Sequence, residues 1–464
     1  MNFGGGFVPD YVLGEMFSGP GGIALGAEDA SKKISGAGGS SIRHGWAVEY
    51  HPDTARTYRE NIEGAGEDTV FTADVREFDL RKVPEFNAFA FGFPCNDFST
   101  VGEHKGLDGD YGALYTFGVH ALALRKPDWF IAENVSGLSK ANGGMAFGKI
   151  LSALRRPGAA ALTDSHFTEF YGAEAEAVEQ DLEYELVAHL YKFEEYGLPQ
   201  RRHRFIITGI RRDIYENLEH GFQVPKPTTP QKIQQKTAWE AIEKDPIHPE
   251  AYNNTRIKHR QSVVDRLEAI PAGKNAFNTK FADESLRLNV KGVTLSNIYR
   301  RLARDEPSYT VTGSGGGGTH MYHWEEPRAL TNRERARLQT FPDWFQFFGG
   351  TPSVRRQVGM AVPPEGAQVV LEAMLNTLDG TRYESVRPSI DAEELIRAFE
   401  LSEHAEEAQM HLESAFSDQE HGDELEISDR PLLQVLRGGG EEQCLEATAE
   451  ERIDETAEAR RISG

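Results

Sequence analysis

Short apolar runs alternate with stretches of helical spacing along the first half of the chain. The runs are rich in Val, Ile, Phe and Tyr and are bounded by glycine or polar residues, as is typical of buried strands. They predict strands at 11–13, 45–48, 69–71, 89–91, 128–132, 182–192 and 205–208, with helices beginning near residue 23 and covering 120–125. This alternation predicts an α/β fold: an open, largely parallel sheet with helices on both faces, whose ligands gather at the carboxyl ends of the strands.

The alternation ends after Arg212. The stretch 225–230, Pro-Lys-Pro-Thr-Thr-Pro, has the composition of a linker, and the residues from there to about Pro307 lack clear periodicity. We therefore predict a catalytic domain over 10–215, a smaller separate domain with linkers over 216–325, and a return to the catalytic domain over 326–385. In the return, Thr331 and Glu334 have the spacing of a helix capping box, and 367–378 predicts the last apolar helix.

Charge changes the interpretation of two segments. The formal net charge of −23 first argues against a nucleic-acid partner, but residues 391–464 contain 22 acidic and 6 basic residues and so carry −16 of it. Residues 226–301 contain 14 basic and 8 acidic residues, a charge of +6, and are suited to meet phosphates. We expect 386–464 to be an acidic, partly disordered tail, although surface charge of either sign can also serve solubility alone.

Composition excludes several classes of protein. No stretch approaches the roughly 18 unbroken apolar residues of a membrane helix, and the first residues have neither the basic start nor the apolar core of a secretory signal. Cys95 and Cys444 are the only cysteines, which excludes a disulfide framework, argues against a thiolate zinc site and fits a reduced, cytoplasmic compartment. We expect no bound metal and no membrane partner.

Residues suited to a nucleotide-like ligand follow three of the predicted strands in order. The first strand runs into 17–22, Phe-Ser-Gly-Pro-Gly-Gly, a tight turn before a helix where the backbone can approach a ligand. Glu49 ends the second strand and Asp74 follows the third. Each feature alone is as well explained by an ordinary turn, a helix cap or a solvated loop. Together they favour a bound adenosine-type cofactor, with Glu49 on its ribose.

Four side chains near other strand ends suit covalent chemistry. Cys95 follows the apolar run 89–91, and Glu133 ends the run at 128–132, so both are expected to face one crevice. A thiol held at a strand end is what a nucleophile needs, although a free cysteine is more often a small buried residue. Arg202 and Arg204, two apart at the start of a strand, are expected to point to one side, or else to be ordinary surface arginines.

Six stretches together resemble the DNA (cytosine-5) methyltransferase family, of prokaryotic type, in the family's order from Tyr11 to Leu378. They are FSGPGG, GFPCNDFS, ENVSGL, QRRHR, RALTNRERARLQTFPD and QVGMAVPP. The resemblance implies a Rossmann-like S-adenosylmethionine methyltransferase sheet, with a target-recognition domain in the basic segment between QRRHR and RALTNRE. It also implies S-adenosylmethionine as cofactor, double-stranded DNA as partner, and methyl transfer to C5 of a flipped-out cytosine in a specific sequence.

The resemblance further implies roles for individual residues. Cys95 would add to C6 of the cytosine, Glu133 would serve ring N3, and Arg202 and Arg204 would serve ring O2 and the geometry around Glu133. The loop 96–112 has the glycines to close over the flipped base. The implied cofactor-binding residues are Phe17, Ser18, Gly19, Gly21, Gly22, Glu49, Tyr50, Asp74, Val75, Pro94, Met360 and Ala361. The candidate DNA contacts are Ser99, Arg256, Lys258, Arg260, Arg300 and Arg301.

Four positions depart from the family pattern. Asn96 stands where the family has Gln after the cysteine, Glu15 replaces a shorter acid, Asn87 replaces an Asp, and Met360 replaces an Asn at the cofactor end. Met360 could weaken cofactor binding, but the cysteine, the glutamate and the arginines are all present. We expect an active, monomeric enzyme of the prokaryotic cytosol or nucleoid. A restriction endonuclease acting on the same site is a candidate partner.

Three other functions stay open at this point. A relative with the same blocks could methylate RNA cytosine, although the large separate segment favours DNA. A non-catalytic homologue could bind only DNA or cofactor, which the intact Cys95, Glu133 and Arg202 argue against. A dinucleotide-dependent oxidoreductase would explain the glycine turn but gives no role to Cys95 beside Glu133.

Overall fold

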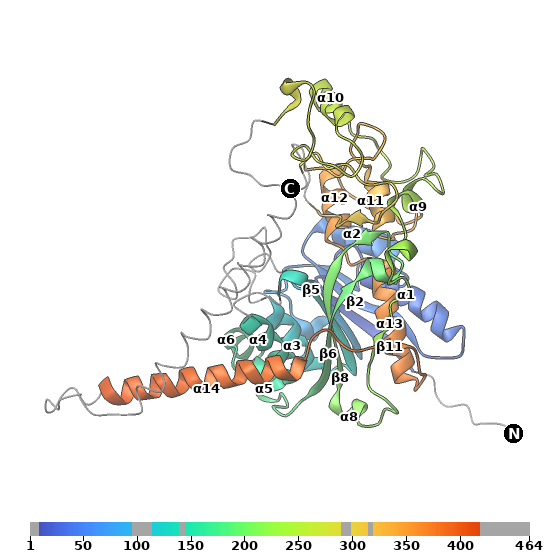
Figure 1. Ribbon diagram of the computed structural model, residues 1–464. Coiled ribbons are helices and arrows are strands. Elements are labelled where there is room, and N and C mark those ends of the chain that lie inside the picture. Colours follow the sequence, from blue (N-terminus) through green and yellow to red (C-terminus); the bar gives the residue numbers. More distant parts are fainter. Residues whose placement is uncertain (1–8, 95–113, 139–143, 289–297, 314–318, 418–464) are drawn as a thin grey trace, which may run out of the picture. The chain divides into compact units, whose positions relative to one another are not determined.

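A seven-stranded sheet lies at the centre of the computed structural model, which describes residues 9–94, 114–138, 144–288, 298–313 and 319–417 (Figure 1). The chain divides into two compact units, 1–401 and 402–464, and the sheet belongs to the first. The strand order is β3-β2-β1-β4-β5-β8-β6. The strands are β1 (Asp10–Met16), β2 (Ser41–Glu49), β3 (Val70–Thr72), β4 (Ala88–Phe91), β5 (Trp129–Val135), β6 (Tyr184–Lys192) and β8 (His203–Arg211).

The first five strands are parallel, so their carboxyl ends meet at one edge of the sheet. β8 runs antiparallel to β5, and β6 antiparallel to β8. The apolar runs therefore predicted the strands of this sheet, and the expected α/β fold with a Rossmann-like sheet is confirmed.

Side-chain alternation explains why helices cover both faces of the sheet. Phe89 and Phe91 of β4 join one hydrophobic cluster, whereas Ala88 and Ala90 join another. The first cluster is covered by α3 (Tyr115–Arg125), α4 (Met145–Arg155), α5 (Pro157–Leu162) and α6 (Ser165–Tyr171), the second by α1 (Gly22–Ser35) and α13 (Pro364–Leu378). Figure 1 shows these two sets of helices on opposite sides of the sheet.

The other elements are short and lie mostly at the ends of the sheet. The remaining helices of the first unit are α2 (Pro52–Asn61), α7 (Ala173–Glu176), α8 (Arg212–Tyr215), α9 (Ala238–Ile242), α10 (Gln261–Ala269), α11 (Asn332–Leu338) and α12 (Thr351–Met360). Two strand pairs lie outside the main sheet: β7 (Gln200–Arg201) with β10 (Ser308–Tyr309), and β9 (Val224–Pro225) with β11 (Ser385–Val386). No helix among the described residues is long and apolar enough to cross a bilayer.

The segment between β8 and α11 has little regular structure, as its lack of periodicity predicts. It has a small hydrophobic cluster of its own around Leu267, Ile270 and Tyr299. Another cluster joins Ile242 and Leu302 to the helices α2, α11 and α12. Figure 1 shows α10 far from the sheet, and α11 and α12 lie between α10 and the sheet.

The expected acidic tail begins with ordered structure. α14 covers Ala392–Ser417. Its first turns belong to the first unit, because Ala392 and Ile396 are buried in the same hydrophobic cluster as the side chains of α4. Gly148 of α4 leaves room for this contact, since a Cβ there would lie 2.7 Å from the carbonyl oxygen of Leu395. The composition placed the boundary of the tail at 386, but apolar side chains at helical spacing keep the chain packed as far as Ile396, and the first unit extends to Leu401. Residues 418–464 lie outside the described residues.

Candidate active site

The turn after β1 has an unusual backbone. Phe17 has a φ of 54°, which is strained for a bulky residue, and Gly19 and Gly21 have φ values of 58° and 100°. These angles turn the chain sharply before α1 begins at Gly22. A Cβ on Gly19 would meet nothing within 4 Å, so this part of the turn faces open space. The predicted glycine turn is therefore shaped to bring backbone N–H groups to a ligand at the start of a helix.

Glu49 joins the end of β2 to that turn. Its two oxygens accept hydrogen bonds from the backbone N–H of Gly19 at 3.1 Å and of His51 at 2.9 Å. Burial raises the pKa of Glu49, and these N–H groups and the nearby Arg356 oppose the rise. The carboxylate predicted to bind ribose is thus held rigidly beside the glycine turn. Next to it, Tyr50 is 62% exposed and presents its ring to solvent.

Asp74 lies at the surface after β3 and forms a bidentate ion pair with Arg76. The hydrogen bonds from Arg76 hold the pKa of Asp74 below its usual range. Val75 beside it is buried. The structure therefore places Glu49 and Asp74 at the ends of neighbouring strands, as the sequence predicts, with Asp74 already paired to a cation.

Glu15 lies beneath the turn and belongs to a buried hydrogen-bonded chain. It is 1% exposed and accepts a hydrogen bond from the hydroxyl of Tyr58. Tyr58 Oη lies 3.1 Å from Nδ1 of His44, whose Nε2 lies 2.9 Å from Thr69 Oγ1. Burial raises the pKa of Glu15 to about 8, and the Tyr58 hydroxyl limits the rise. Glu15, which replaces the shorter acid of the family pattern, therefore has Tyr58 as its hydrogen-bond partner. The sequence alone did not indicate this pairing.

The segment that leads to Cys95 passes against Glu133. A Cβ on Gly92 would lie 3.4 Å from Glu133 Oε2, and the side chain of Asn134 donates to the carbonyl of Phe93 at 3.3 Å. Both contacts bring the chain to Pro94, the last described residue before Cys95. Cys95, Asn96 and Ser99 lie outside the described residues. The end of β5 thus lies beside residues 92–94, which lead to Cys95. This fits the expectation that Cys95 and Glu133 face one crevice.

Arg204 and Arg202 occupy different environments. Arg204 Nε forms an ion pair with Glu133 Oε1 at 2.8 Å, and both side chains are 14% exposed. Arg202 is 1% exposed and donates to the carbonyls of Val311 at 3.3 Å and Gly359 at 3.2 Å. Burial holds the pKa of Arg202 well below its usual value. Arg202 thus differs from Arg204 in its direct contacts, because it precedes β8 and is buried against backbone carbonyls, although the charges of Arg204 and Glu133 are near enough to act on it.

Two buried glutamines connect three of the sequence blocks. Gln200 donates to the Gln339 side chain at 2.7 Å and to the carbonyl of Leu338 at 3.1 Å, and it accepts from the N–H of Val311 at 2.7 Å. Gln339 in turn donates to the carbonyl of Ala361 at 3.1 Å. Met360, beside Ala361, is 67% exposed, so the departure from the family pattern lies at the surface. Sequence reasoning missed these glutamines and Asn134 as site-building residues, although all three stand inside matched blocks.

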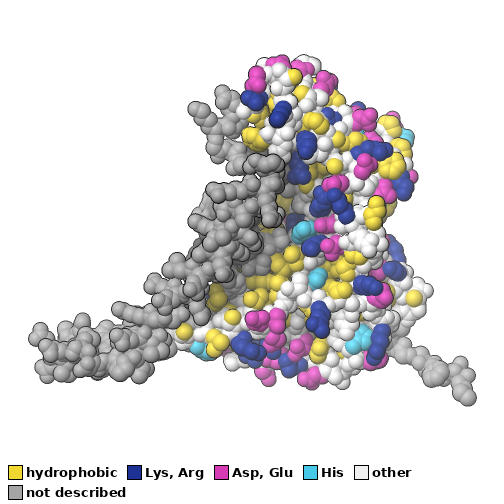
Figure 2. Space-filling model, in the orientation of Figure 1, with side chains coloured by type: hydrophobic (Ala, Val, Ile, Leu, Met, Phe, Trp, Pro, Cys, Tyr) yellow, Lys and Arg dark blue, Asp and Glu magenta, His cyan; other side chains and the backbone are white. Residues whose placement is uncertain are grey.

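The candidate DNA contacts divide into exposed and buried side chains. Lys258 and Arg260 are exposed, and Arg256 is 64% exposed in an ion pair with Glu326. Arg300 lies over the ring of Tyr309, 4.6 Å from its centroid. Arg301 is only 5% exposed and donates to the carbonyls of Leu267, Ile270 and His323, so its predicted contact with DNA is not supported. Figure 2 shows basic and acidic side chains interspersed over the face in view.

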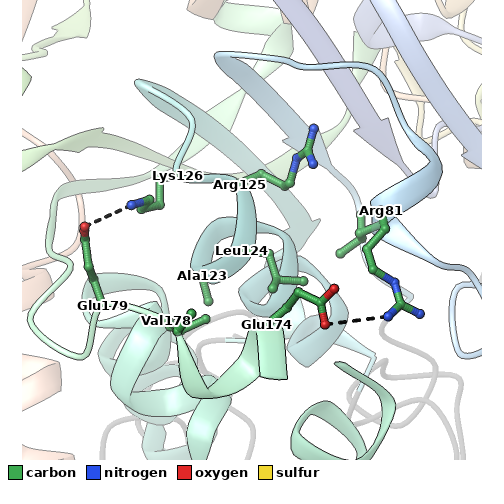
Figure 3. A pocket seen from close by; sticks show the side chains of 10 residues that line it. Arg81, Ala123, Leu124, Arg125, Lys126, Glu174, Val178 and Glu179 are labelled. Atoms are coloured by element: carbon green, nitrogen blue, oxygen red, sulfur yellow. Dashed lines mark hydrogen bonds and ion pairs between the residues drawn. The ribbon is translucent and has the colours of Figure 1, made fainter. Parts of the chain in front are cut away.

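A cavity of about 260 Å³ lies away from these groups (Figure 3). It is lined by the last residues of α3 and Lys126 after it, by Leu80 and Arg81, and by Glu174 and residues 177–179. Figure 3 shows two ion pairs at its rim, Arg81 with Glu174 and Lys126 with Glu179. Because α3 leads into the amino end of β5, the cavity is at the opposite end of the strand from Glu133.

The fold and the strand-end groups are those of a Rossmann-like methyltransferase. A family model described as C-5 cytosine-specific DNA methylase matches residues 11–158 and 174–376. The chain therefore belongs to this family, and it is a DNA (cytosine-5-)-methyltransferase. The match ends at residue 376, before α14 begins.

Curated relatives are similar over most of the chain. Type II methyltransferase M.BbvI of Brevibacillus brevis is 50% identical over 385 residues, which cover 82% of this chain and 95% of that protein. Type II methyltransferase M.NgoFVII of Neisseria gonorrhoeae is 35% identical, covering 80% of this chain and 88% of that one. Among solved structures, a prophage-encoded E. coli protein described as a DNA modification methyltransferase aligns with a TM-score of 0.55 at 19% identity, over 79% of this chain and 99% of that one. This last likeness concerns the fold alone.

Proposed function

We propose that this enzyme transfers a methyl group from S-adenosylmethionine to C5 of a flipped-out cytosine in one specific DNA sequence, through a covalent adduct of Cys95 with C6. The observation that supports it most is the Glu133–Arg204 ion pair at the end of β5, packed against Gly92, three residues before Cys95. The pair is present in a chain that belongs to the C-5 cytosine-specific DNA methylase family.

The residues at the ends of β1, β2 and β3 fit the proposed cofactor. The turn at Gly19 is open, Glu49 is fixed beside it, and one oxygen of Glu15 is buried there without a hydrogen-bond partner among the described residues. When bound, S-adenosylmethionine supplies an electrophilic methyl group on a sulfonium. Glu49 would accept hydrogen bonds from the ribose hydroxyls, Asp74 would meet the adenine amino group, and Tyr50 offers an exposed ring to the same ligand.

The chain's own groups account for the activation of cytosine. Carbon C5 is a weak nucleophile until the Cys95 thiolate adds to C6 and pushes an electron pair toward C5 and N3. Glu133 would share a proton with N3, and Arg204 would hold Glu133 in place and offer a donor to O2. C5 then bonds to the methyl carbon as the bond from that carbon to the sulfonium sulfur breaks, and the sulfur keeps the electron pair and leaves as a thioether. Loss of the C5 proton returns its electron pair to the ring and expels the Cys95 thiolate, so the ring is restored.

The position of the Glu133–Arg204 pair supports the proposal that the cytosine leaves the helix. The Glu133–Arg204 pair is only slightly exposed and lies at the sheet edge, where a base stacked in a duplex could not reach it. Flipping would bring C6 to Cys95 and N3 to Glu133 at once. Asn134, which ties Phe93 to the end of β5, would keep the cysteine segment in register with Glu133.

Transfer of labelled methyl from S-adenosylmethionine to DNA tests this proposal. We expect incorporation into duplex DNA, none into RNA, and loss of incorporation in Cys95→Ala. A Cys95→Ala variant that still methylates would contradict the covalent mechanism, and incorporation into RNA alone would contradict the substrate. The Cys444→Ala variant is the matched control, since it removes the other cysteine of the chain.

The specific sequence is found by bisulfite sequencing of DNA from cells that express the protein. We expect one short motif to be protected from conversion at every copy. The relatives named as Type II methyltransferases support a further part of the proposal, a partner endonuclease that cuts the same motif. DNA methylated by this enzyme should then resist that endonuclease.

A further inference from the structure

A pocket of about 250 Å³ lies where the short strands β7 and β10 pair. Four basic side chains and one acidic side chain line it, a net charge of +3: Arg201, Lys274, Arg300, Arg301 and Glu306. Cations that line one concave surface raise the local concentration of anions. The pocket is therefore suited to a negatively charged ligand.

Three of these cations can be reached from solvent. Lys274 is exposed, Arg300 is partly exposed, and the side chain of Arg201 is 34% exposed. Arg301 differs from them, because it is enclosed and donates to backbone carbonyls. An external ligand can therefore contact Lys274, Arg300 and Arg201, whereas Arg301 belongs to the wall of the pocket.

Lys274 forms no ion pair or side-chain hydrogen bond with any described residue. Its backbone is held in place, since its N–H donates to the carbonyl of Pro271 at 3.1 Å and its carbonyl accepts the N–H of Arg301 at 2.9 Å. A hydrated surface lysine without a partner is ordinary. The pocket that Lys274 shares with two accessible arginines is what makes its charge available to a specific anion.

Arg201 already binds one anion in this pocket. Its Nη2 lies 2.7 Å from Glu306 Oε2, and Lys232 Nζ lies 2.8 Å from the other carboxylate oxygen. The hydrogen bonds from Lys232 and Arg201 lower the pKa of Glu306 to about 2, so Glu306 is ionised at physiological pH. Because Lys232 also offsets this charge, Arg201 has N–H donors and positive charge to offer a second anion.

The pocket lies near the proposed catalytic centre. Arg201 is three residues before Arg204, the partner of Glu133, so the Cα atoms of the two arginines are no more than about 10 Å apart. Lys274 and Arg300 come from the segment between β8 and α11. Successive nucleotides of one DNA strand rise by about 3.4 Å. A strand whose cytosine reaches Glu133 would therefore have a phosphate within a few nucleotides that can meet this pocket.

We propose that Arg201, Lys274 and Arg300 form a binding site for one phosphate of the substrate DNA backbone. The arginine forks match the oxygens of a phosphate, and the lysine adds a point charge. The inference rests on the proposed function, because it takes duplex DNA as the source of the phosphate. Arg201 and Lys274 were not among the DNA contacts that the sequence suggested. The site positions the strand, since a phosphate contact carries no base information.

The salt dependence of DNA binding tests the site. Each phosphate contact adds about 0.9 to the slope of log K against log salt concentration. We expect Lys274→Met combined with Arg300→Met to lower that slope by about 0.9, because Arg201 alone would remain with Glu306. Adding Arg201→Met should lower it no further, since all three cations meet one phosphate. The control combines Lys32→Met and Lys33→Met, two exposed cations in the last turn of α1, and should leave the slope unchanged.

A second measurement separates a phosphate contact from a base contact. The variant with Lys274→Met and Arg300→Met should lose the same factor in affinity for DNA with and without the methylated motif, because phosphates are common to both. A loss confined to DNA with the motif would show base contacts and contradict the proposal.

Other outcomes would also overturn the inference. A folded double variant with the wild-type slope would do so, and so would a triple variant that lowers the slope by about 1.8 or more, the value for two phosphates. If inorganic phosphate raises the Tm of the wild type but not of the double variant while their slopes are equal, the pocket binds free phosphate and not DNA. Should the double variant fail to fold, an unchanged slope in Lys274→Met would decide against the site.

Failure of this inference differs from failure of the proposed function. A wild-type enzyme that methylates DNA while its variants keep the slope refutes only the phosphate site. A wild type without methyl transfer refutes the proposed function.

Discussion

Burial decides what each charged side chain of this site can do. Glu133 and Arg204 keep a narrow opening to solvent and pair with each other, so they remain available to a substrate. Arg202, two residues from Arg204, is enclosed and spends its donors on the carbonyls of Val311 and Gly359. The two arginines are alike in sequence, but we infer that Arg204 acts in the chemistry, whereas Arg202 stabilises the segments around it.

Substitution of the two arginines should separate these roles. We expect Arg204→Met to lower the rate of methyl transfer by about 10²-fold or more, because an oriented donor at the reacting ring is lost, with little change in Tm. Arg202→Met should instead lower Tm, since two buried carbonyls lose a donor at about 1–3 kcal/mol each at most. Single-turnover methyl transfer and thermal unfolding measure the two effects. Equal behaviour of the two variants would contradict the distinction.

Glu15 gives the protein a specific pH dependence of stability. Burial raises the pKa of Glu15 from 4.5 to about 8, so the fold favours the protonated form. The resulting stabilisation is complete below about pH 4.5 and is lost as the pH rises to about 8. Glu15→Gln stays neutral and lacks this loss, so it should become more stable than the wild type at pH 8, on the order of a few kcal/mol.

Urea unfolding of both proteins at pH 5 and pH 8 measures this difference in the free energy of unfolding. The comparison cancels the titration of all other groups, because they are common to both proteins. A difference between the two proteins that is the same at pH 5 and at pH 8 would show that Glu15 does not titrate in this range.

At the scale of elements, α11 joins the long segment that precedes it to α2 and α12. It begins with a capping box in which the Thr331 hydroxyl accepts the N–H of Glu334, while Glu334 accepts the N–H of Thr331. The helix carries Arg333, whose guanidinium donates to the carbonyls of Tyr252 and Pro342, and it ends before Gln339. The local pair Thr331 and Glu334 therefore fixes the start of α11, although the helix contacts residues far away in the sequence, such as Tyr252.

Thr331→Ala tests the importance of this start. Loss of the cap should lower the free energy of unfolding by about 1 kcal/mol, and up to about 2 because the cap is buried. Denaturant unfolding measures the change. Thr255→Ala, an exposed threonine of the same segment, is the control and should change stability by less than about 0.5 kcal/mol. Equal effects of the two substitutions would mean that the capping box adds nothing.

At the scale of the whole molecule, the family match and the packed unit end at different residues. The match ends at 376, whereas the first unit extends to Leu401 through α14. Ile396 of α14 is 2% exposed, and Arg155 of α4 pairs with Glu393 at 2.6 Å. The first turns of this helix are thus part of the folded catalytic unit although they lie beyond the matched region. Residues 418–464 carry 14 acidic and 5 basic residues, a charge of −9.

Two truncations distinguish these parts of the chain. Ending the chain at Ser417 should leave Tm and the rate of methyl transfer unchanged and tighten DNA binding at low salt, because the net charge falls in magnitude from −23 to −14. Ending it at Asp391 also removes Ile396 and should cost roughly 2–5 kcal/mol of stability. Thermal unfolding and DNA binding at two salt concentrations measure both effects. The same Tm for the two truncated proteins would contradict the role of α14.

Much of the fold could be predicted because its signals are local. Apolar runs such as 89–91 are long enough to mark a strand, and Thr331 with Glu334 marks a helix start without any tertiary context. The order of the matched blocks also predicts that Gly19, Glu49 and Glu133 come at strand ends along the chain and lie at the same edge of the sheet. The tail was less predictable, because the apolar spacing of α14 has meaning only against the surface of α4.

The sequence by itself determined the class of the protein: the α/β alternation, the glycine turn, the strand-end acids and the order of the blocks. Only the tertiary structure decided which of the charged side chains are buried and which remain accessible to a ligand. It buried Arg202, Arg301 and Arg335 and left Arg204 at the opening, since burial depends on segments that are far apart in the chain. The physical reason is that strand and cap signals act between neighbours in sequence, whereas desolvation and pairing of charges act between neighbours in space.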